Sequence, residues 1–271
     1  MIANFGKRLM SFCKKDIIEK EDKKERSYGF FGDYSSWEDV EELCCGGYGR
    51  DGILQATLAS TLKVKNGEAV FERDSFIFDE IQYSFGLLAS LLKVAIENNN
   101  SLNVLDFGGA LGSHYFQNKE FLKPVKIERW IVVEQEHYVK AGKEKIADGI
   151  LEFAYSIDEV KNANVLIASS ILQYLNTPYE WLQKLVDKEI PYMIFDRTAF
   201  SLENRDRLTL QKVPPEIYEA IVPSWFLSER RFLDVVRKKY QLISAFDSYI
   251  DVVEEIPSVS KGFLFKLRET R

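Results

Sequence analysis

A buried strand that ends in a glycine-rich turn constrains this chain more than any other feature. The apolar segment Val104-Leu105 leads into Asp106, and Phe107-Gly108-Gly109-Ala110-Leu111-Gly112 follows. Because glycine has no Cβ, the chain can take a tight or positive-φ path there and let another group approach the backbone. Such apolar runs form the inner strands of parallel sheets, and open α/β sheets bind ligands beyond the carboxyl ends of their strands. We therefore expect an α/β fold with a ligand site at residues 106–112.

The glycine spacing bears on the choice of ligand. A dinucleotide-binding turn has glycine at its first, third and sixth positions. If the last two are aligned with Gly109 and Gly112, Phe107 takes the place of the first. This disfavours an NAD(P)-dependent oxidoreductase, which stays an alternative.

The same segment resembles the cofactor loop of class I S-adenosylmethionine (SAM) methyltransferases. Asp106 closes the strand, Gly108 follows two residues later, and Gly112 ends the turn. The middle glycine of their usual D-x-G-x-G-x-G is Ala110 here, with Gly109 one place earlier. The resemblance implies that Asp106 and the three glycines contact SAM, with S-adenosylhomocysteine (SAH) as the product.

Composition narrows the class of partner. The 271 residues, 46% hydrophobic and 29% charged, suffice for one sizeable core with an appendage. A net charge of −6 and dispersed Lys and Arg residues argue against nucleic acid and favour a small-molecule substrate. The three cysteines are Cys13, Cys44 and Cys45, and they lack C-x-x-C spacing. We therefore expect no metal site and no disulfide framework, and a location in the reducing cytoplasm.

We divide the chain into a charged N-terminal segment (1–26), a helical lid region (27–100) and a SAM-binding Rossmann-like domain (101–271). Met1 to Lys15 lacks the continuous apolar core of a signal peptide. Its apolar and basic residues permit a basic amphipathic helix on an anionic membrane, against the alternative of a solvated surface helix.

The lid region is expected to be mostly helical, with helices at 53–64 and 76–98. Ser35 or Ser36 can cap a further short helix. Gly46-Gly47-Tyr48-Gly49 lacks a preceding strand and a Lys-Ser/Thr ending, so it predicts an ordinary loop rather than a phosphate cradle. Glu72-Arg73-Asp74 is a charged turn that either folds over the site or starts a solvated helix.

After residue 101 strands and helices alternate, which indicates βαβ units. We expect a mostly parallel seven-stranded sheet with a terminal antiparallel hairpin, and an insertion at 197–227 that covers a site. The expected strands are residues 103–107, 129–133, 151–154, 165–168, 192–195, 241–249 and 262–267, and the expected helices include 138–147, 178–186 and 228–239.

Glu134 ends the second strand of this sheet, 28 residues after Asp106. A carboxylate there can accept hydrogen bonds from both hydroxyls of an adenosine ribose. The alternative is an acid that only interacts with the dipole of the following helix. Asp106 has a comparable alternative, as a carboxylate that merely caps the glycine turn.

The ends of the third and fourth strands supply further candidates. By resemblance to these methyltransferases, Ser169 and Ser170 contact the methionine part of SAM, and Tyr155 and Ser156 lie near the adenine. The two serines at 169 and 170 serve equally well as an ordinary helix start.

Methyl transfer mainly requires alignment of the acceptor and exclusion of water. A hydroxyl acceptor would benefit from a base, and His114 is the candidate, against a surface or capping role; His137 is expected to be structural. Arg197 follows a buried strand and can hold a phosphate or carboxylate group. Arg205 and Arg207 are expected to form surface ion pairs.

A narrower resemblance covers nearly the whole chain after Tyr28. It rests on Phe31–Trp37, Phe71–Asp74, Leu105–Ser113, Ile194–Thr198, Val213–Tyr218 and Pro223–Trp225. These segments resemble SAM-dependent methyltransferases of bacterial surface-polysaccharide (capsule and O-antigen) biosynthesis. The resemblance implies a cytoplasmic enzyme that acts on a sugar, a nucleotide-sugar or a phosphorylated precursor. We expect a hydroxyl group as the methyl acceptor, and a dimer is the candidate oligomeric state. A catalytically silent nucleotide-binding scaffold of the same fold is the alternative.

Overall fold

A computed structural model describes residues 28–44, 51–214, 220–248 and 256–269. The 1–26 segment with its candidate membrane helix lies outside these ranges, as do Cys13, Cys45, the Gly46–Gly49 loop and Tyr218. Within the described ranges, no helix combines the length and the hydrophobicity needed to cross a lipid bilayer.

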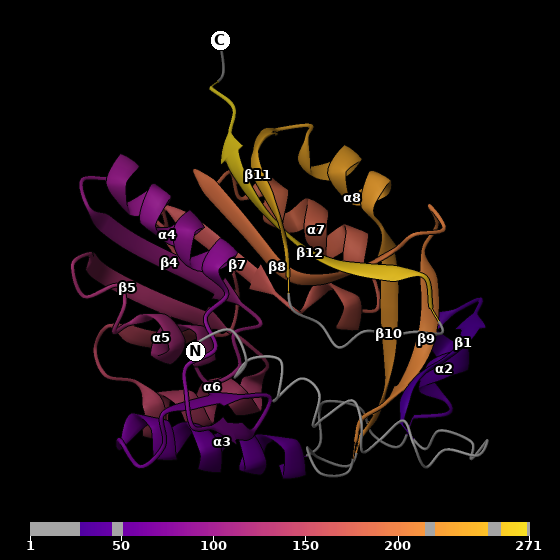
Figure 1. Ribbon diagram of the computed structural model, residues 1–271, viewed down its shortest axis with the longest axis horizontal. Helices are drawn as coiled ribbons and strands as arrows, with labels where there is room; N and C mark the ends of the chain where they lie inside the picture. The colour runs from indigo at the N-terminus through magenta and orange to yellow at the C-terminus, as the bar shows by residue number, and fades with distance from the viewer. Residues whose placement is uncertain (1–27, 45–50, 215–219, 249–255, 270–271) are drawn as a thin grey trace, which may run out of the picture.

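Five parallel strands form the centre of the molecule, in the order β6-β5-β4-β7-β8 (Figure 1). They are β4 (Ser101–Phe107), β5 (Lys126–Val133), β6 (Leu151–Ala154), β7 (Val165–Ser169) and β8 (Tyr192–Ser201). β12 (Ser258–Leu267) pairs antiparallel with β8, and β11 (Tyr240–Asp247) pairs antiparallel with β12. The expected Rossmann-like α/β fold and its terminal hairpin are confirmed.

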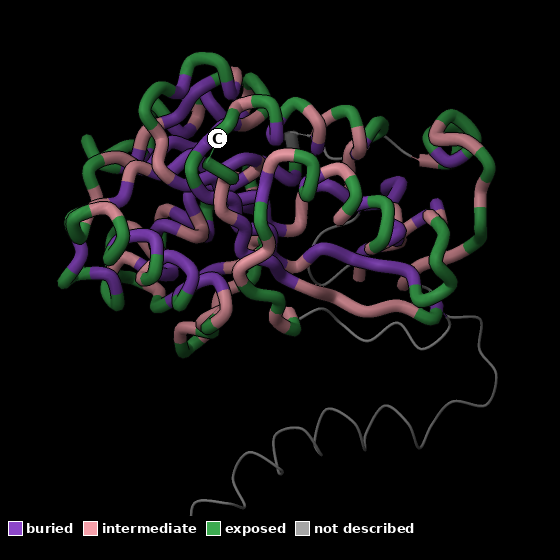
Figure 2. The backbone as a smooth tube through the Cα atoms, turned by 90° about the horizontal axis from the view of Figure 1, so that it is seen from above, coloured by how far each residue is buried: buried purple, intermediate pink, exposed green. Residues whose placement is uncertain are grey.

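Alternate side chains of these strands enter two cores, one on each face of the sheet. Val104 packs in one core with side chains from α4 (Phe85–Glu97), α5 (Ser113–Asn118) and α6 (Glu136–Ala141). Leu105 enters the other with α7 (Pro178–Asp187) and α8 (Glu229–Val236). Figure 2 shows buried segments of the backbone in the interior and exposed segments around them. A π-helical turn, η2 (Gly142–Ile146), continues α6, and a short 3₁₀ turn, η3 (Leu172–Tyr174), follows β7.

The lid region contains less helix than expected. The predicted helix at 53–64 is confirmed as α3 (Asp51–Lys65). The predicted short helix is α2 (Trp37–Glu41), and Ser36 caps it by accepting a hydrogen bond from the Asp39 amide. The predicted helix at 76–98 is wrong before residue 85, because β2 (Phe71–Arg73) and β3 (Phe76–Phe78) form a hairpin there.

The insertion at 197–227 is also more regular than expected. β8 extends to Ser201, and β9 (Arg207–Lys212) and β10 (Ile221–Ser228) follow it. β1 (Gly29–Tyr34) joins them, so that the sheet grows to ten strands with β1-β9-β10 beyond β8, at the right of Figure 1. Leu208 and Leu210 of β9 are buried against Val40 of α2, which gives this extension a small core of its own.

Candidate functional site

The register of the parallel strands brings the predicted site residues to one edge of the sheet. Phe107 pairs with Val133 on one side and Ala168 on the other, and Ser169 pairs with Asp196. The residues after these strands therefore share the carboxyl edge. A cavity of about 1250 Å³ lies there, and seven predicted residues line it: Gly108, Gly109, His114, Glu134, Ser169, Ser170 and Arg197.

The loop after β4 can pass this cavity only because of its glycines. Gly108 has a φ of +73°, and a Cβ there would lie 2.5 Å from Cγ1 of Ile171. A Cβ on Gly109 would lie 2.5 Å from the carboxyl carbon of Asp106. Ala110 lines the cavity with a φ of +50°. Gly108 and Gly109 thus line the cavity with main chain alone, because the side chains of Ile171 and Asp106 occupy the places where their Cβ atoms would lie.

Asp106 lies beneath the loop, and it is fully buried. Its Oδ2 accepts hydrogen bonds from Nε1 of Trp130 at 3.0 Å and from Nδ1 of His114 at 3.4 Å. Its Oδ1 has no partner in the described part of the chain. Neither Asp106 nor Gly112, which precedes α5, is among the residues that line the cavity. Asp106 thus supports the loop from below.

His114 is in the first turn of α5, with its ring between Asp106 and the cavity. Burial lowers its pKa, but the charge of Asp106, the hydrogen bond to it and the charge of Asp196 outweigh burial. The net result is a pKa above the ordinary value of 6.5. His114 therefore holds its proton over a wider pH range than a solvated histidine.

Glu134 directly follows β5 and is half-buried at the cavity wall. Burial raises its pKa to about 7, although the backbone N–H groups of Gln135 and Ala110 stabilise the carboxylate. The Gln135 amide donates to Oε2 at 2.7 Å. This hydrogen bond agrees with the alternative that Glu134 interacts with the start of the following helix. The side chain also lines the cavity, as the ribose interpretation requires.

The ends of β7 and β8 form the opposite wall. Ser169 is buried, and its Oγ has no hydrogen-bond partner among the described residues. Ser170 has a φ of +52°, and its amide donates to the Asp196 carbonyl at 3.0 Å. Nε2 of Gln173 donates to Oγ of Ser170 at 3.2 Å and to the Arg197 carbonyl at 3.1 Å. These bonds fix the two strand ends to each other.

Arg197 reaches from the end of β8 towards the lid region. Its φ is +48°, and its Nη2 donates to Oδ2 of Asp74 at 3.1 Å. Burial lowers its pKa, and the charge of Asp74 and the hydrogen bond to it raise the pKa above its ordinary value. The buried Nε has no partner in the described part of the chain. A fixed cation with a donor to spare thus lines the cavity.

One residue missed as a site candidate is Glu72, which is 1% exposed and lines the cavity. Ser113 donates its hydroxyl hydrogen to Oε1 of Glu72, and Oε2 has no partner among the described residues. Burial raises the pKa of Glu72 to about 7. The charged turn of residues 72–74 therefore folds over the site, which was one of the two interpretations from sequence.

Tyr155 and Ser156 do not line the cavity. Tyr155 is exposed with Nζ of Lys143 4.4 Å from its ring centre, and Oγ of Ser156 accepts from the Asp158 amide. They follow β6 at the same sheet edge, one strand beyond Glu134.

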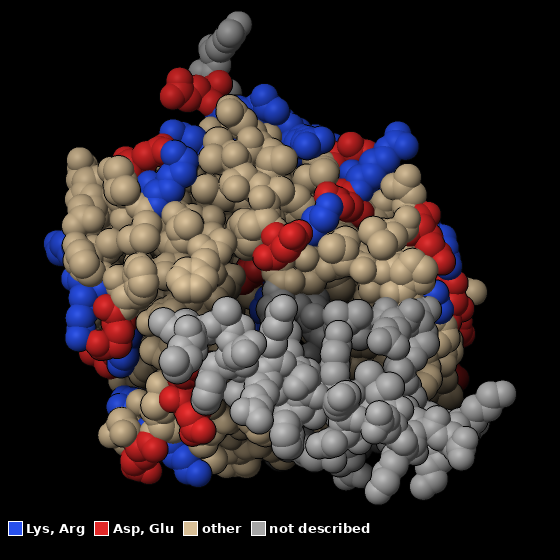
Figure 3. Space-filling model, viewed as in Figure 1, with Lys and Arg blue, Asp and Glu red and all other residues tan. Residues whose placement is uncertain are grey.

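The expected surface ion pairs are confirmed for Arg205 but not for Arg207, whose hydrogen bonds go to a backbone carbonyl. Arg205 forms ion pairs with Asp33 and Glu203, and Arg207 donates to the Gly32 carbonyl. Basic and acidic side chains are interspersed on the face drawn in Figure 3. Within the described ranges, no group of three His, Cys, Asp or Glu side chains could hold a metal ion.

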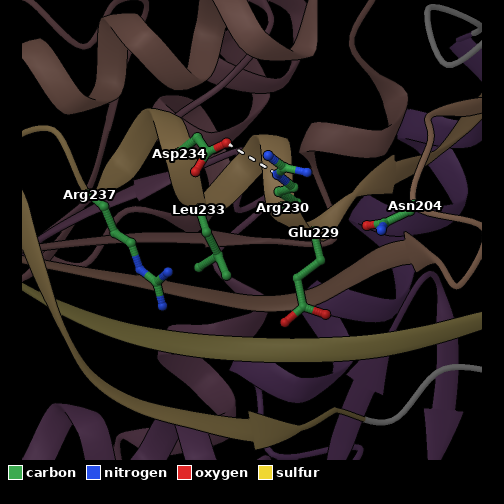
Figure 4. Close-up of a pocket in the computed structure, with 6 residues that line it drawn as sticks. All are labelled: Asn204, Glu229, Arg230, Leu233, Asp234 and Arg237. Atoms are coloured by element: carbon green, nitrogen blue, oxygen red, sulfur yellow. Dashed lines mark ion pairs between the residues drawn. The ribbon is translucent and has the colours of Figure 1, made fainter.

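A second hollow of about 300 Å³ lies along α8 (Figure 4). Glu229, Arg230 and Asp234 line it, and Arg230 and Asp234 pair at 4.0 Å one helical turn apart. Such exposed pairs are ordinary features of a solvated helix. We therefore assign the candidate site to the large cavity.

Comparisons with known proteins give similarity at the level of structure. No protein-family model matches the chain, and no curated protein matches it. One similar solved structure is an S-adenosylmethionine-dependent methyltransferase from Clostridium acetobutylicum, at 12% identity and a TM-score of 0.44, over 69% of this chain and 92% of that one.

Two further structures were solved with SAH. The N-methyltransferase NodS from Bradyrhizobium japonicum is 12% identical with a TM-score of 0.45, over 78% of this chain and all of its own. The N-terminal domain of EvdMO1, in the presence of SAH and D-fucose, is 11% identical with a TM-score of 0.46, over 77% of this chain and 95% of its own.

Proposed function

We propose that this chain is a SAM-dependent methyltransferase. The observation that carries the proposal is the Cβ-free loop at Gly108 and Gly109, which turns its main chain to a large cavity beside Glu134. A main-chain wall and an acid at the end of the next strand suit a ribose and the adjoining polar groups of a nucleoside.

The residues at this edge fit SAM. Glu134 would accept hydrogen bonds from the ribose hydroxyls, and Gly108 and Gly109 would lie against the cofactor. The unpartnered Oγ of Ser169 would meet a polar group of the methionine part, with Ser170 beside it. SAM supplies a methyl group on a positively charged sulfur, which is an electrophile with a neutral leaving group.

The remaining residues have indirect roles in this proposal. Asp106 would support the loop from beneath Gly109, held there by Trp130 and His114, and so act on the cofactor without lining the cavity. Gly112, which precedes α5 at the end of the loop, would likewise shape the loop without lining the cavity. Tyr155 and Ser156 would reach an adenine only if it extended beyond the cavity towards β6.

We further propose a polar acceptor that carries a hydroxyl group to be methylated. Arg197 would bind an anionic group of that acceptor through the unpartnered Nε. Aromatic side chains of the lid, Phe71, Phe76 and Phe78, line the same cavity and would pack against an apolar ring face. A sugar, a nucleotide-sugar or a phosphorylated capsule or O-antigen precursor combines these features.

Isothermal titration with SAM, SAH and NADH tests the proposal. We expect micromolar 1:1 binding of SAM and SAH and none of NADH. A catalytically silent scaffold that no longer binds the cofactor would give no heat with either sulfur compound, and an oxidoreductase would bind NADH. Mass spectrometry of small molecules retained during purification would then identify acceptor candidates.

A further inference from the structure

We propose that Glu72 is the catalytic base, which takes the proton of the acceptor hydroxyl at its Oε2 during methyl transfer. This inference rests on the proposed function and deepens it. It assigns a step of the reaction to the lid, for which the proposed function had only packing contacts.

The hairpin that carries Glu72 is held rigidly over the cavity. Its turn residues Asp74 and Ser75 have φ values of 53° and 70°, as a two-residue hairpin turn of type I′ requires. Asp74 binds Arg197 of β8 at 3.1 Å, and the Ser75 hydroxyl lies 2.9 Å from that of Thr57 in α3. The turn is therefore fixed to two separate elements.

Glu72 itself is held by a third element. The hydroxyl of Ser113, at the start of α5, donates to Oε1 and fixes the carboxyl group next to the end of the glycine loop. The backbone N–H of Ser75 also stabilises the carboxylate. Oε2 nevertheless has no hydrogen-bond partner of good geometry among the described residues, and its side chain lines the cavity. A buried carboxylate oxygen without a donor is costly, so it calls for a donor from a ligand.

The charged and titratable groups around Glu72 suit a base. Asp74 on the same hairpin disfavours its charge, while His114 on α5 favours it. Tyr138 on α6 also faces Glu72, and burial raises the pKa of this phenol, so it stays neutral. With a pKa of about 7, Glu72 can accept and release a proton near neutral pH.

His114 is less suited to the same task. Its Nδ1 is engaged with Asp106, and its raised pKa favours the protonated ring, which cannot take a proton from an acceptor. His114 is then the positive neighbour that helps Glu72 to lose its proton.

The proposed step balances without another reactant. The acceptor oxygen forms a bond to the methyl carbon with one lone pair, and the electron pair of the broken carbon–sulfur bond stays on sulfur. The proton of the acceptor hydroxyl passes to Oε2 of Glu72, which later releases it to water.

Sinefungin tests the position of Glu72 without knowledge of the acceptor. In this analogue an amine-bearing carbon replaces the methylated sulfur of SAM, whereas SAH has neither the methyl group nor the charge. If Glu72 faces the transfer point, its carboxylate binds the ammonium group. At pH 8 we expect sinefungin to bind roughly tenfold or more tightly than SAH by isothermal titration.

The Glu72→Gln variant should bind SAH as the wild type does and lose the preference for sinefungin. The glutamine side chain keeps an oxygen that can accept from Ser113, and Glu80→Gln, at an exposed position of the lid, is the matched control with an unchanged preference. A preference that is absent from the wild type, or that survives in Glu72→Gln, would overturn the inference. Absence of SAH binding to the wild type would instead reject the proposed function.

The wild type alone provides a second measurement if the variant folds poorly. The ratio of the two dissociation constants should fall towards one between pH 8 and pH 6, because Glu72 becomes protonated there. Titration of Glu134 affects the ribose contact of both ligands and cancels in the ratio. A ratio independent of pH would contradict the assignment.

Discussion

The unfolding free energy of Glu72→Gln, measured relative to that of the wild type, should increase as the pH rises. Glu72 is 1% exposed, and burial raises its pKa from 4.5 to about 7 in the folded protein. Between these pH values the folded state therefore binds a proton that the unfolded chain releases. The contribution of Glu72 to stability is consequently favourable at low pH and is lost as the pH rises through 7.

The magnitude follows from the two pKa values. At roughly 1.4 kcal/mol for each pH unit between them, the wild type loses about 3 kcal/mol of stability between pH 4.5 and pH 8 because of this group. A glutamine side chain does not titrate, so this loss should be absent from Glu72→Gln. The difference in unfolding free energy between variant and wild type should thus grow by about 3 kcal/mol over that range.

Urea unfolding at several pH values, followed by tryptophan fluorescence, to which the buried Trp130 contributes, measures this difference. Glu134 also has a raised pKa, but it titrates in both proteins and cancels. Glu80→Gln, at an exposed position of the lid, is the control for the removal of one carboxylate. A difference for Glu72→Gln that does not change with pH would refute the prediction.

Three further predictions concern the cofactor edge. Glu134→Ala should weaken SAM binding by about 1–3 kcal/mol through the loss of charge-assisted hydrogen bonds, and an unchanged dissociation constant by titration would reject the ribose assignment. Gly109→Ala should lower the unfolding free energy by about 1–3 kcal/mol and impair SAH binding, because its Cβ would lie 2.5 Å from the Asp106 carboxyl carbon. The helical Gly52→Ala, with no atom within 4 Å of its Cβ, should change stability in denaturant titrations by less than about 1 kcal/mol. By NMR, His114 should titrate above pH 6.5 in the wild type and at a lower pH in Asp106→Asn; equal values in the two proteins would remove Asp106 as the cause.

The parallel core of the fold could be predicted from the sequence because its strands are short apolar runs between clear turn and helix signals. Residues 151–154 were predicted as the strand that the structure contains, and β4, β5 and β7 differ only at their ends. The register then brings Gly108, Glu134 and Ser169 to one edge, as parallel pairing requires. Local pattern and tertiary structure agree in this part of the chain.

The lid hairpin could not be predicted in the same way. Phe76-Ile77-Phe78 is apolar at every position, so it fits a helix as well as a strand. Its turn is Asp74-Ser75, which lacks the glycine that usually marks a type I′ turn. The strand was recognisable only from its pairing with Phe71–Arg73.

The importance of Glu72 depends on contacts between distant segments. Its partner Ser113 is 41 residues away, and the neighbouring Asp74 pairs with a residue 123 positions away. Spacing along the chain carries no information about such contacts. A charged turn next to an apolar hairpin was the only available signal.

A crystal structure of the complex with SAH would test most directly whether the carboxyl edge of the sheet binds the cofactor. We predict SAH in the large cavity, against the main chain of Gly108 and Gly109, with its ribose hydroxyls hydrogen-bonded to Glu134. SAH bound on another surface, or in the cavity without contact to Glu134 and the glycine loop, would contradict this assignment.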